Sequence, residues 1–236
     1  MFCLNSESPS PVLVFAIIAG FFNFKLVNGE KKMNVQTCFE KLKESKVLSF
    51  ATVDLSGNPQ IRCVSAVHYE TDYLYFFTAK GKAFCEELLS NSNVQILAHT
   101  EKNEMIRLSG NAYPAPENKQ QKFIETIFSE LPFMNEIYPG NTKKAGIIFY
   151  IKDAKIEYFN LDSKPIWREF FTIGNAKLSF KGYRISENCT GCKKCIKVCP
   201  QNCIKEGKPF TILQNNCLHC GACFEACSNN AVEKIN

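Results

Sequence analysis

The feature that most constrains this chain is a repeat of cysteines near its C-terminal end. Eight cysteines form two runs with the same spacing, C-x2-C-x2-C-x3-C, and one constant interval separates each cysteine of the first run from its counterpart in the second. The two runs are Cys189, Cys192, Cys195 and Cys199, and then Cys217, Cys220, Cys223 and Cys227. Thiolates at this short spacing can surround an iron–sulfur cluster. The repeat therefore predicts two equivalent sets of metal ligands.

Zinc and disulfide bonds are the alternatives for these eight cysteines. A structural zinc site takes four ligands in two pairs, and eight cysteines in this register exceed that need. Disulfides are typical of secreted chains, but a C-x2-C-x2-C run pairs poorly with itself. Cys203 lies outside the repeat, because the second run has Ala231 at the corresponding position. We interpret Cys203 as a small buried residue and not as a ligand.

The two runs resemble the motifs of bacterial two-cluster ferredoxins, in which the fourth cysteine of each run binds the other cluster. Pro200 follows the first run as in that pattern, whereas Ser228 follows the second. The resemblance implies two 4Fe–4S clusters. One would be held by Cys189, Cys192, Cys195 and Cys227, and the other by Cys217, Cys220, Cys223 and Cys199.

Composition bounds the compartment and the class of partner. The chain has 13 cysteines, and the five outside the runs are scattered without a disulfide framework, so we expect a reducing compartment and a cytoplasmic protein. The net charge of +5 is modest, and the absence of a basic run with interleaved aromatic residues argues against nucleic acid as a partner. The 45% hydrophobic content and 20 phenylalanines can support a substantial core.

Residues 1–32 contain an apolar run from Val12 to Phe22 that is too short to span a membrane. The run lacks the preceding Lys or Arg and the following A-x-A site of a signal peptide. We interpret residues 1–32 as a non-native extension, with a membrane-associating segment or a signal peptide as the alternatives. We expect the folded part to start at Met33, and we do not expect a membrane partner.

From residue 34 to residue 160, the apolar pattern predicts many short strands and a few helices. Helical spacing covers residues 34–45 and 82–90, and it recurs after Pro116, where Phe123, Ile124, Ile127 and Phe128 share one face. Turn residues 54–59 separate the first two strands. The predicted strands cover residues 47–53, 60–69, 73–78, 94–99, 105–113, 147–151 and 155–160. Many short alternating strands are typical of a small barrel.

The stretch KVLSFATVDLSGNPQIRCVSAVHYETDYLYFFTAKGKAFCEELLSNSNVQILAH resembles the pyridoxamine 5′-phosphate oxidase-like family of flavin-binding split barrels, as does the later DAKIEYFNLDSKPIWREF. The resemblance implies a mainly β fold, a split β-barrel with a few helices, followed by a small α+β ferredoxin-like two-cluster domain. We expect the barrel over residues 33–161, a packed connector over 162–182 and the ferredoxin domain over 183–236.

That family binds FMN at a homodimer interface, and the resemblance implies the same here. The phosphate would be held by Arg62 on the second strand and by Thr78, Lys80 and Lys82 after the third. The backbone of Cys63, Val64 and Ser65 would edge the flavin ring. A phosphate favours charged donors and a helix N-terminus, and Lys82 opens a predicted helix. A solvated strand arginine and an ordinary cationic loop are the alternatives.

Iron–sulfur clusters move one electron at a time, whereas FMN accepts one or two. A chain with both kinds of cofactor is expected to be an FMN- and iron–sulfur-dependent oxidoreductase that passes electrons between a ferredoxin-type domain and FMN to reduce a small organic substrate. The alternatives are an electron-transfer protein between redox partners and a redox sensor. A basic set for a substrate phosphate is not evident in the sequence, which argues against oxidation of pyridoxamine phosphate. The sequence assigns no catalytic residue.

Overall fold

The computed structural model describes residues 33–235, so the interpretation of residues 1–32 lies outside the described part. Met33–Asn236 cluster as one compact unit. Among the described residues, no helix combines the length and apolarity that crossing a membrane requires.

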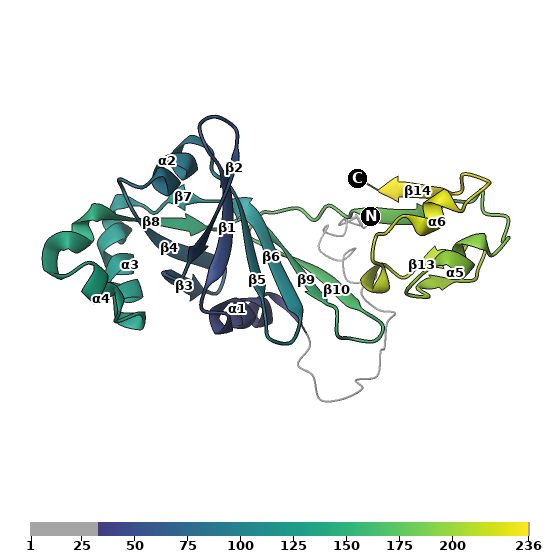
Figure 1. Cartoon of the computed structure of the whole chain (residues 1–236), viewed down its shortest axis with the longest axis horizontal. Helices are drawn as coiled ribbons and strands as arrows, with labels where there is room; N and C mark the ends of the chain where they lie inside the picture. Colours follow the sequence, from purple (N-terminus) through teal and green to yellow (C-terminus); the bar gives the residue numbers. More distant parts are fainter. Residues whose placement is uncertain (1–32, 236) are drawn as a thin grey trace, which may run out of the picture. The chain divides into compact units, whose positions relative to one another are not determined.

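The first part of this unit consists of two antiparallel sheets (Figure 1). The six-stranded sheet has the order β10-β9-β6-β5-β1-β2. Its strands are β1 (Leu48–Val53), β2 (Pro59–Val64), β5 (Asn93–His99), β6 (Glu104–Asn111), β9 (Ala154–Asn160) and β10 (Trp167–Ile173). The four-stranded sheet has the order β3-β4-β8-β7, with β3 (Val67–Glu70), β4 (Tyr73–Ala79), β7 (Tyr113–Pro114) and β8 (Gly146–Ile151).

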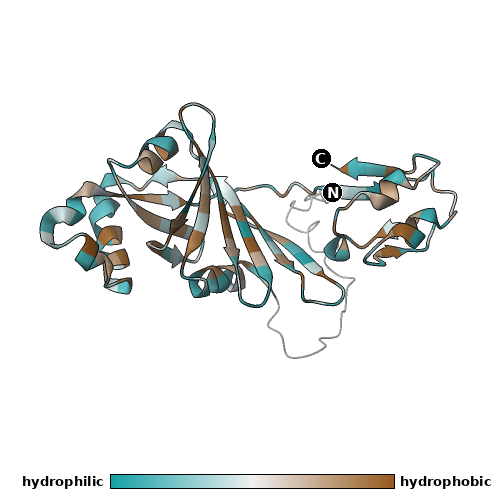
Figure 2. Ribbon diagram, in the orientation of Figure 1, coloured by the Kyte–Doolittle hydropathy of each residue, from teal (hydrophilic) through white to brown (hydrophobic). Residues whose placement is uncertain are grey.

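The strands form because their side chains alternate between core and surface. Buried and exposed residues alternate without exception along β5, as the period of two in a strand requires. Figure 2 shows hydrophobic residues interleaved with polar ones along these strands. Residues from both sheets meet in one apolar cluster, and its largest fully buried members include Phe50, Phe76 and Phe149. This core holds together the two sheets of a split barrel.

Helices cover the ends and one face of the barrel. The helices are α1 (Val35–Glu44), α2 (Ala83–Ser90), α3 (Glu117–Glu130), α4 (Met134–Ile137) and the 3-10 turn η2 (Gly140–Ala145). Asn34 and Thr37 cap α1 reciprocally through side chain and backbone, which satisfies donors that a helix start leaves free. The apolar face predicted after Pro116 is buried in α3 and packs with Tyr75 and Phe77 of β4.

Three predicted segments differ from the structure. The predicted strand over residues 105–113 leaves the six-stranded sheet after Asn111, and Tyr113 starts β7 in the other sheet. The predicted strand over residues 60–69 is two strands, since β2 ends at Val64 and β3 starts at Val67 in the other sheet. The chain changes sheets at this break, and continuous strand-forming residues conceal it. Part of the predicted connector, Trp167–Ile173, is the strand β10 at the edge of the six-stranded sheet, paired with β9 over its full length. Burial does not alternate regularly along β10, so a period of two gives no signal for this strand.

The second part keeps the repeat of the cysteine runs in its backbone. Its short elements are β11 (Gly182–Ile185), α5 (Lys194–Val198), β12 (Ile204–Lys205), β13 (Thr211–Ile212), η3 (Gln214–Asn216), α6 (Ala222–Glu225) and β14 (Val232–Ile235). β11 pairs with β14, and β12 pairs with β13. The two halves therefore exchange strands, because β11 and β12 belong to the first half, β13 and β14 belong to the second, and each pairs with a strand of the other half.

Candidate iron–sulfur centre and flavin site

The structure brings the eight cysteines of the repeat around two cavities. One cavity, open to solvent and with about 340 Å³ of empty space, is lined by Cys189, Cys192, Cys195 and Cys227 together with Ile185, Phe210 and Val232. The other, with about 320 Å³, is lined by Cys199, Cys217, Cys220 and Cys223 together with Cys203, Tyr183, Ile204 and Ile212. The last cysteine of each run thus joins the first three of the other, which is the grouping that the ferredoxin resemblance implies.

Backbone conformation around the two cavities repeats as well. Positive φ angles occur at Gly191 (70°) and His219 (58°), at Lys193 (63°) and Gly221 (83°), and at Asn202 (49°) and Asn230 (49°). The members of each pair occupy corresponding positions of the two runs. Left-handed residues are uncommon outside glycine and asparagine, so three matched pairs indicate that both runs wrap their cavities in the same way.

The donor set fits iron–sulfur clusters. Soft thiolates select zinc, copper(I) and iron–sulfur clusters, and no group of three or more His, Cys, Asp or Glu in the described part of the chain is placed to hold a single metal ion. Backbone N–H groups also donate to sulfur, from His219 to Cys217 Sγ and from Ala231 to Cys227 Sγ, each over 3.3 Å. Such bonds stabilise thiolates and tune cluster potentials. These thiols and the hydrogen bonds to them fit the ligands of an iron–sulfur cluster.

Cys203 is buried, as expected, but it lies beside two of the predicted ligands. Its Sγ is 3.5 Å from Cys199 Sγ. A hydrogen bond from the Cys203 thiol lowers the pKa of Cys217 to about 6, although burial acts in the opposite direction. The same hydrogen bond, followed by burial, raises the pKa of Cys203. The pKa of Cys203 is therefore raised while that of Cys217 is lowered, which suits a donor to a ligand more than a ligand.

The residues predicted to hold the flavin phosphate gather around the start of α2. Thr78 is buried at the end of β4, and Lys80 and Lys82 are exposed in the loop that leads into the helix. Lys82 occupies the N-cap position of α2, where no side chain among the described residues caps the first turn. A helix start of this kind presents N–H groups and a partial positive charge to an anion.

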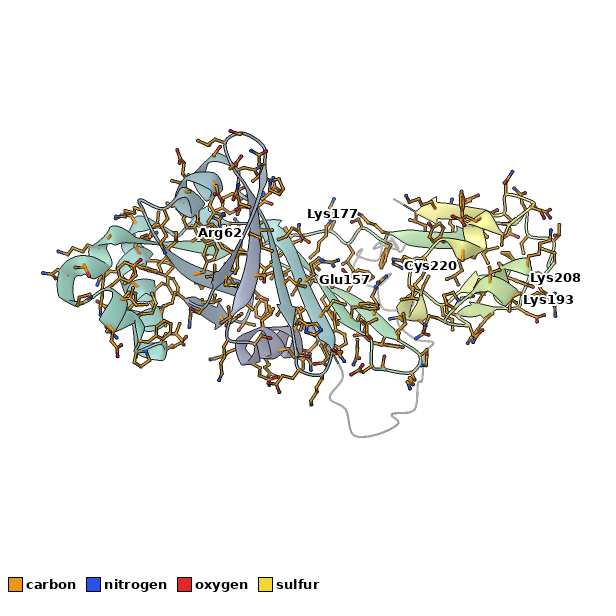
Figure 3. The ribbon with its side chains drawn as sticks, viewed as in Figure 1. Arg62, Glu157, Lys177, Lys193, Lys208 and Cys220 are labelled. Carbon is orange, nitrogen blue, oxygen red and sulfur yellow. The ribbon has the colours of Figure 1, made fainter. Side chains whose placement is uncertain are left out.

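Arg62 lies on β2 against α2 rather than in the loop itself (Figure 3). Its Nη1 is 2.7 Å from Glu87 Oε2, and its guanidinium lies 4.5 Å from the centre of the Phe84 ring. Burial raises the pKa of Glu87, but the ion pair with Arg62 and the hydrogen bond from Thr52 outweigh it and leave the pKa below its ordinary value. Arg62 thus reaches the helix of the proposed phosphate site with part of its charge already paired.

The three residues expected beside the flavin ring end β2. Cys63 is exposed, Val64 is buried and Ser65 is half-buried, and the Ser65 carbonyl accepts a hydrogen bond from the Val67 N–H. They occupy the place where the chain leaves one sheet for the other. Cys63 and Val64 pair with β1 on one side, and because β2 is an edge strand of its sheet, its other side can face a ligand. Their role with flavin stays a prediction.

Sequence reasoning missed several residues that the fold brings to these sites. Lys143 and Lys144 in η2 lie next to the loop of Lys80 and Lys82 that is expected to hold the phosphate, because the Lys80 N–H donates to the Ala145 carbonyl over 2.8 Å. Glu87 and Phe84, which hold Arg62, were also missed. Each of these placements depends on strand or helix packing across the chain, and a local pattern carries no signal for it.

Arg168 on β10 is the other residue that sequence reasoning missed. It is 9% exposed, and it donates to the Cys217 carbonyl and to His219 Nδ1 in the second cysteine run. Burial first, and then the charge of Arg168, lower the pKa of His219 to about 4, so the imidazole is neutral at pH 7. Contact between the barrel sheet and the cysteine run is therefore direct.

Comparisons with known proteins agree with both halves of this description. A family model described as pyridoxamine 5′-phosphate oxidase matches residues 35–153, which are 119 of the 236 residues. A second, described as a 4Fe-4S dicluster domain, matches residues 181–228. No curated protein matches the chain.

Solved structures show the same barrel at low sequence identity. A NimC/NimA family protein from Clostridium acetobutylicum is 20% identical with a TM-score of 0.51, and the match covers 58% of this chain and 91% of that protein. An FMN binding protein related to pyridoxamine 5′-phosphate oxidase, from Nostoc punctiforme, is 15% identical with a TM-score of 0.47, covering 58% and 92%. The predicted split barrel and the ferredoxin-like domain are confirmed by the first structure and the two family matches. The chain belongs to the pyridoxamine 5′-phosphate oxidase family and continues beyond its barrel into a 4Fe–4S dicluster domain.

Proposed function

We propose that this chain is an oxidoreductase in which the dicluster domain exchanges electrons with FMN on the barrel, so that the flavin reduces a small organic substrate. The observation that carries the proposal is the direct bonding between β10 of the barrel and the second cysteine run. Asn215 and Asn216 of η3 donate to the carbonyls of Arg168 and Ile166, each over 2.8 Å. Two redox units that were merely tethered would not need such bonds.

Separate sets of residues hold the flavin and the two clusters in this proposal. Thr78, Lys80 and Lys82 bind the FMN phosphate at the start of α2, with Arg62 in support, and the backbone of residues 63–65 edges the ring. The two sets of four cysteines each hold one 4Fe–4S cluster. When bound, the clusters supply single electrons and the flavin accepts them singly or in pairs, which allows a two-electron reduction. The contribution of the protein is to position both groups.

The match to a family named for pyridoxamine 5′-phosphate oxidase does not by itself supply that reaction, because function depends on the site and not on the fold. Two partners remain compatible with the barrel: a small organic acceptor and a second redox protein. An acceptor needs access to the flavin ring, whereas an electron carrier needs only a route in and a route out. We favour the small-molecule acceptor, in a homodimer in the cytoplasm.

The test is anaerobic purification followed by cofactor analysis and acceptor screening. We expect FMN, about eight iron atoms and about eight acid-labile sulfides per chain. The reduced protein should then be reoxidised by one class in a panel of nitro, quinone and enone compounds. Reoxidation by redox proteins alone, with every small molecule inert, would favour the electron carrier. Loss of the clusters as the only response to oxidants would favour the sensor.

A further inference from the structure

Arg168 connects the barrel sheet with the second cysteine run through a buried side chain. Its guanidinium lies 4.5 Å from the centre of the Phe159 ring. Arg168 and Glu157 lie on the same face of the six-stranded sheet. Arg168 Nε is 3.1 Å from Glu157 Oε1, an ion pair whose alignment falls short of a hydrogen bond. The other oxygen of Glu157 lies 2.6 Å from Arg107 Nη1.

The far end of the same guanidinium reaches the loop between two predicted cluster ligands. Arg168 Nη1 donates to the Cys217 carbonyl over 3.3 Å and to His219 Nδ1 over 2.7 Å. An arginine can only donate, so Nδ1 accepts and the imidazole proton lies on Nε2. His219 is one residue before Cys220. One side chain therefore fixes both the backbone and the histidine of the loop Cys217–Cys220.

The charges around this contact do not cancel. Arg107 and Arg168 share the single carboxylate of Glu157, which leaves a net charge of +1. Arg107 is solvent-exposed, whereas the Arg168 side chain is only 10% exposed, and salt screens an exposed charge much more than a buried one. The excess positive charge that the second cysteine run experiences therefore comes mainly from Arg168.

The first cysteine run lies in a different environment at the corresponding positions. Gly191 occupies the position in the first run that His219 occupies in the second. Lys193 and Lys194 line the first cavity, but both are solvent-exposed: Lys193 pairs with Glu206, and Lys194 donates to Ser228. The backbone repeat therefore surrounds two sites of similar shape with unequal electrostatics.

We propose that Arg168 is a positioning residue that docks the second cysteine run on the barrel and raises the reduction potential of the cluster held there. That cluster, on Cys199, Cys217, Cys220 and Cys223, is then more easily reduced with Arg168 in place than without it, on the side of the ferredoxin domain that contacts the barrel. The inference rests on the two-cluster assignment of the proposed function and is independent of the flavin and of the substrate.

The test is an anaerobic redox titration of both clusters, followed by electron paramagnetic resonance, on the full-length holoprotein. In R168Q we expect the equilibrium constant for one-electron reduction of one cluster to fall about tenfold, the order expected for a unit charge about 10 Å away at an effective dielectric of about 20. That fall is about 59 mV for one electron. The other cluster should change by less than about twofold.

Two further variants separate charge from docking. R107Q removes a guanidinium from the same carboxylate without touching the cysteine run. Because salt screens the exposed Arg107, we expect the equilibrium constant for cluster reduction to change by less than about threefold. R168K keeps the charge but loses the planar fork, so it should restore most of the potential. Hydrogen exchange at residues 215–219 should nevertheless rise in R168K, because one ammonium cannot replace the guanidinium geometry at both acceptors.

Each outcome decides the inference. Unchanged potentials in R168Q with both clusters loaded would overturn it and leave the proposed function intact. A wild-type chain that loads a single cluster would overturn the two-cluster assignment and this inference together. If R168Q loses iron, R168K provides the test instead. A tenfold fall in the equilibrium constant for cluster reduction in R168K would contradict the role of charge. Unchanged hydrogen exchange at residues 215–219 in R168K would contradict the docking role.

Discussion

At the scale of single residues, the structure distinguishes cysteines that hold metal from a cysteine that serves them. Cys203 is buried beside Cys199 and Cys217, and its thiol stays protonated. We expect Cys203→Ala to leave about eight iron atoms per chain, because each cavity already has four other cysteines. Iron and sulfide analysis after anaerobic reconstitution checks this, with Cys223→Ala as the matched ligand variant. Loss of about half the iron in Cys203→Ala would make Cys203 a ligand and the grouping wrong.

A second residue, Glu104, anchors α1 to the barrel. Its carboxylate accepts from Lys41 Nζ at 2.6 and 2.7 Å, from Tyr158 OH at 2.7 Å and from Thr100 Oγ1 at 3.0 Å. Burial alone would raise the pKa of Glu104, but these donors leave it below its ordinary value. The stabilisation is therefore complete above the ordinary glutamate pKa of about 4.3 and is lost as the pH falls through the lower folded value.

We accordingly expect Glu104→Gln to lower the free energy of unfolding by about 2 kcal/mol, the scale of a hydrogen bond to a charged group. The difference in the free energy of unfolding between variant and wild type should be the same at pH 7 and pH 5.5, since Glu104 is ionised at both. Urea unfolding followed by the fluorescence of Trp167 measures it, because Trp167 is the single tryptophan and lies on β10. Glu101→Gln, in an exposed loop, is the control. A difference that disappears already at pH 5.5 would contradict the lowered pKa.

At the scale of elements, the start of α2 is the proposed phosphate site. Lys82→Ala removes one charge-assisted contact, worth roughly 1.5–3 kcal/mol, so FMN affinity should fall about ten- to a hundredfold. Iron content should not change, because the cysteines of both cavities lie outside the barrel. Fluorescence titration of the flavin-stripped protein measures the affinity, and the exposed Lys102 provides the control Lys102→Ala. An unchanged affinity would move the phosphate away from α2 and toward Lys143 and Lys144.

The elements also show how far the sequence alone could predict this protein. The constant interval between the two cysteine runs predicted two equivalent sites, and the resemblance to two-cluster ferredoxins implied their exchange of ligands. Strand alternation predicted most of the barrel strands. The change of sheet between Val64 and Val67 was not predictable, because both halves consist of ordinary strand residues. The ion pair between Arg62 and Glu87 depends on α2 packing against β2, which only long-range folding determines.

At the scale of the whole molecule, we expect a homodimer with FMN between the barrels. The β1–β2 hairpin, which carries the predicted flavin residues on β2, exposes two large apolar side chains, Ile61 at 74% and Leu55 at 64%. In the expected dimer, the partner barrel would cover these two side chains. Ile61→Lys should shift the protein toward the monomer and weaken FMN binding in parallel, as measured by light scattering and flavin titration. A monomeric wild type that still binds FMN tightly would contradict the dimer.

In the proposed function, the dicluster domain supplies electrons to the flavin of the same chain. The direct test is anaerobic stopped-flow mixing with a reduced low-potential ferredoxin, recorded at the cluster and flavin bands. In wild type we expect the clusters to be reduced first and the flavin afterwards, at a rate that does not depend on protein concentration. Cys220→Ser, which removes a predicted ligand of the cluster nearest the barrel, should slow flavin reduction at least tenfold with FMN still bound. Equal flavin reduction rates in the two proteins would contradict the claim.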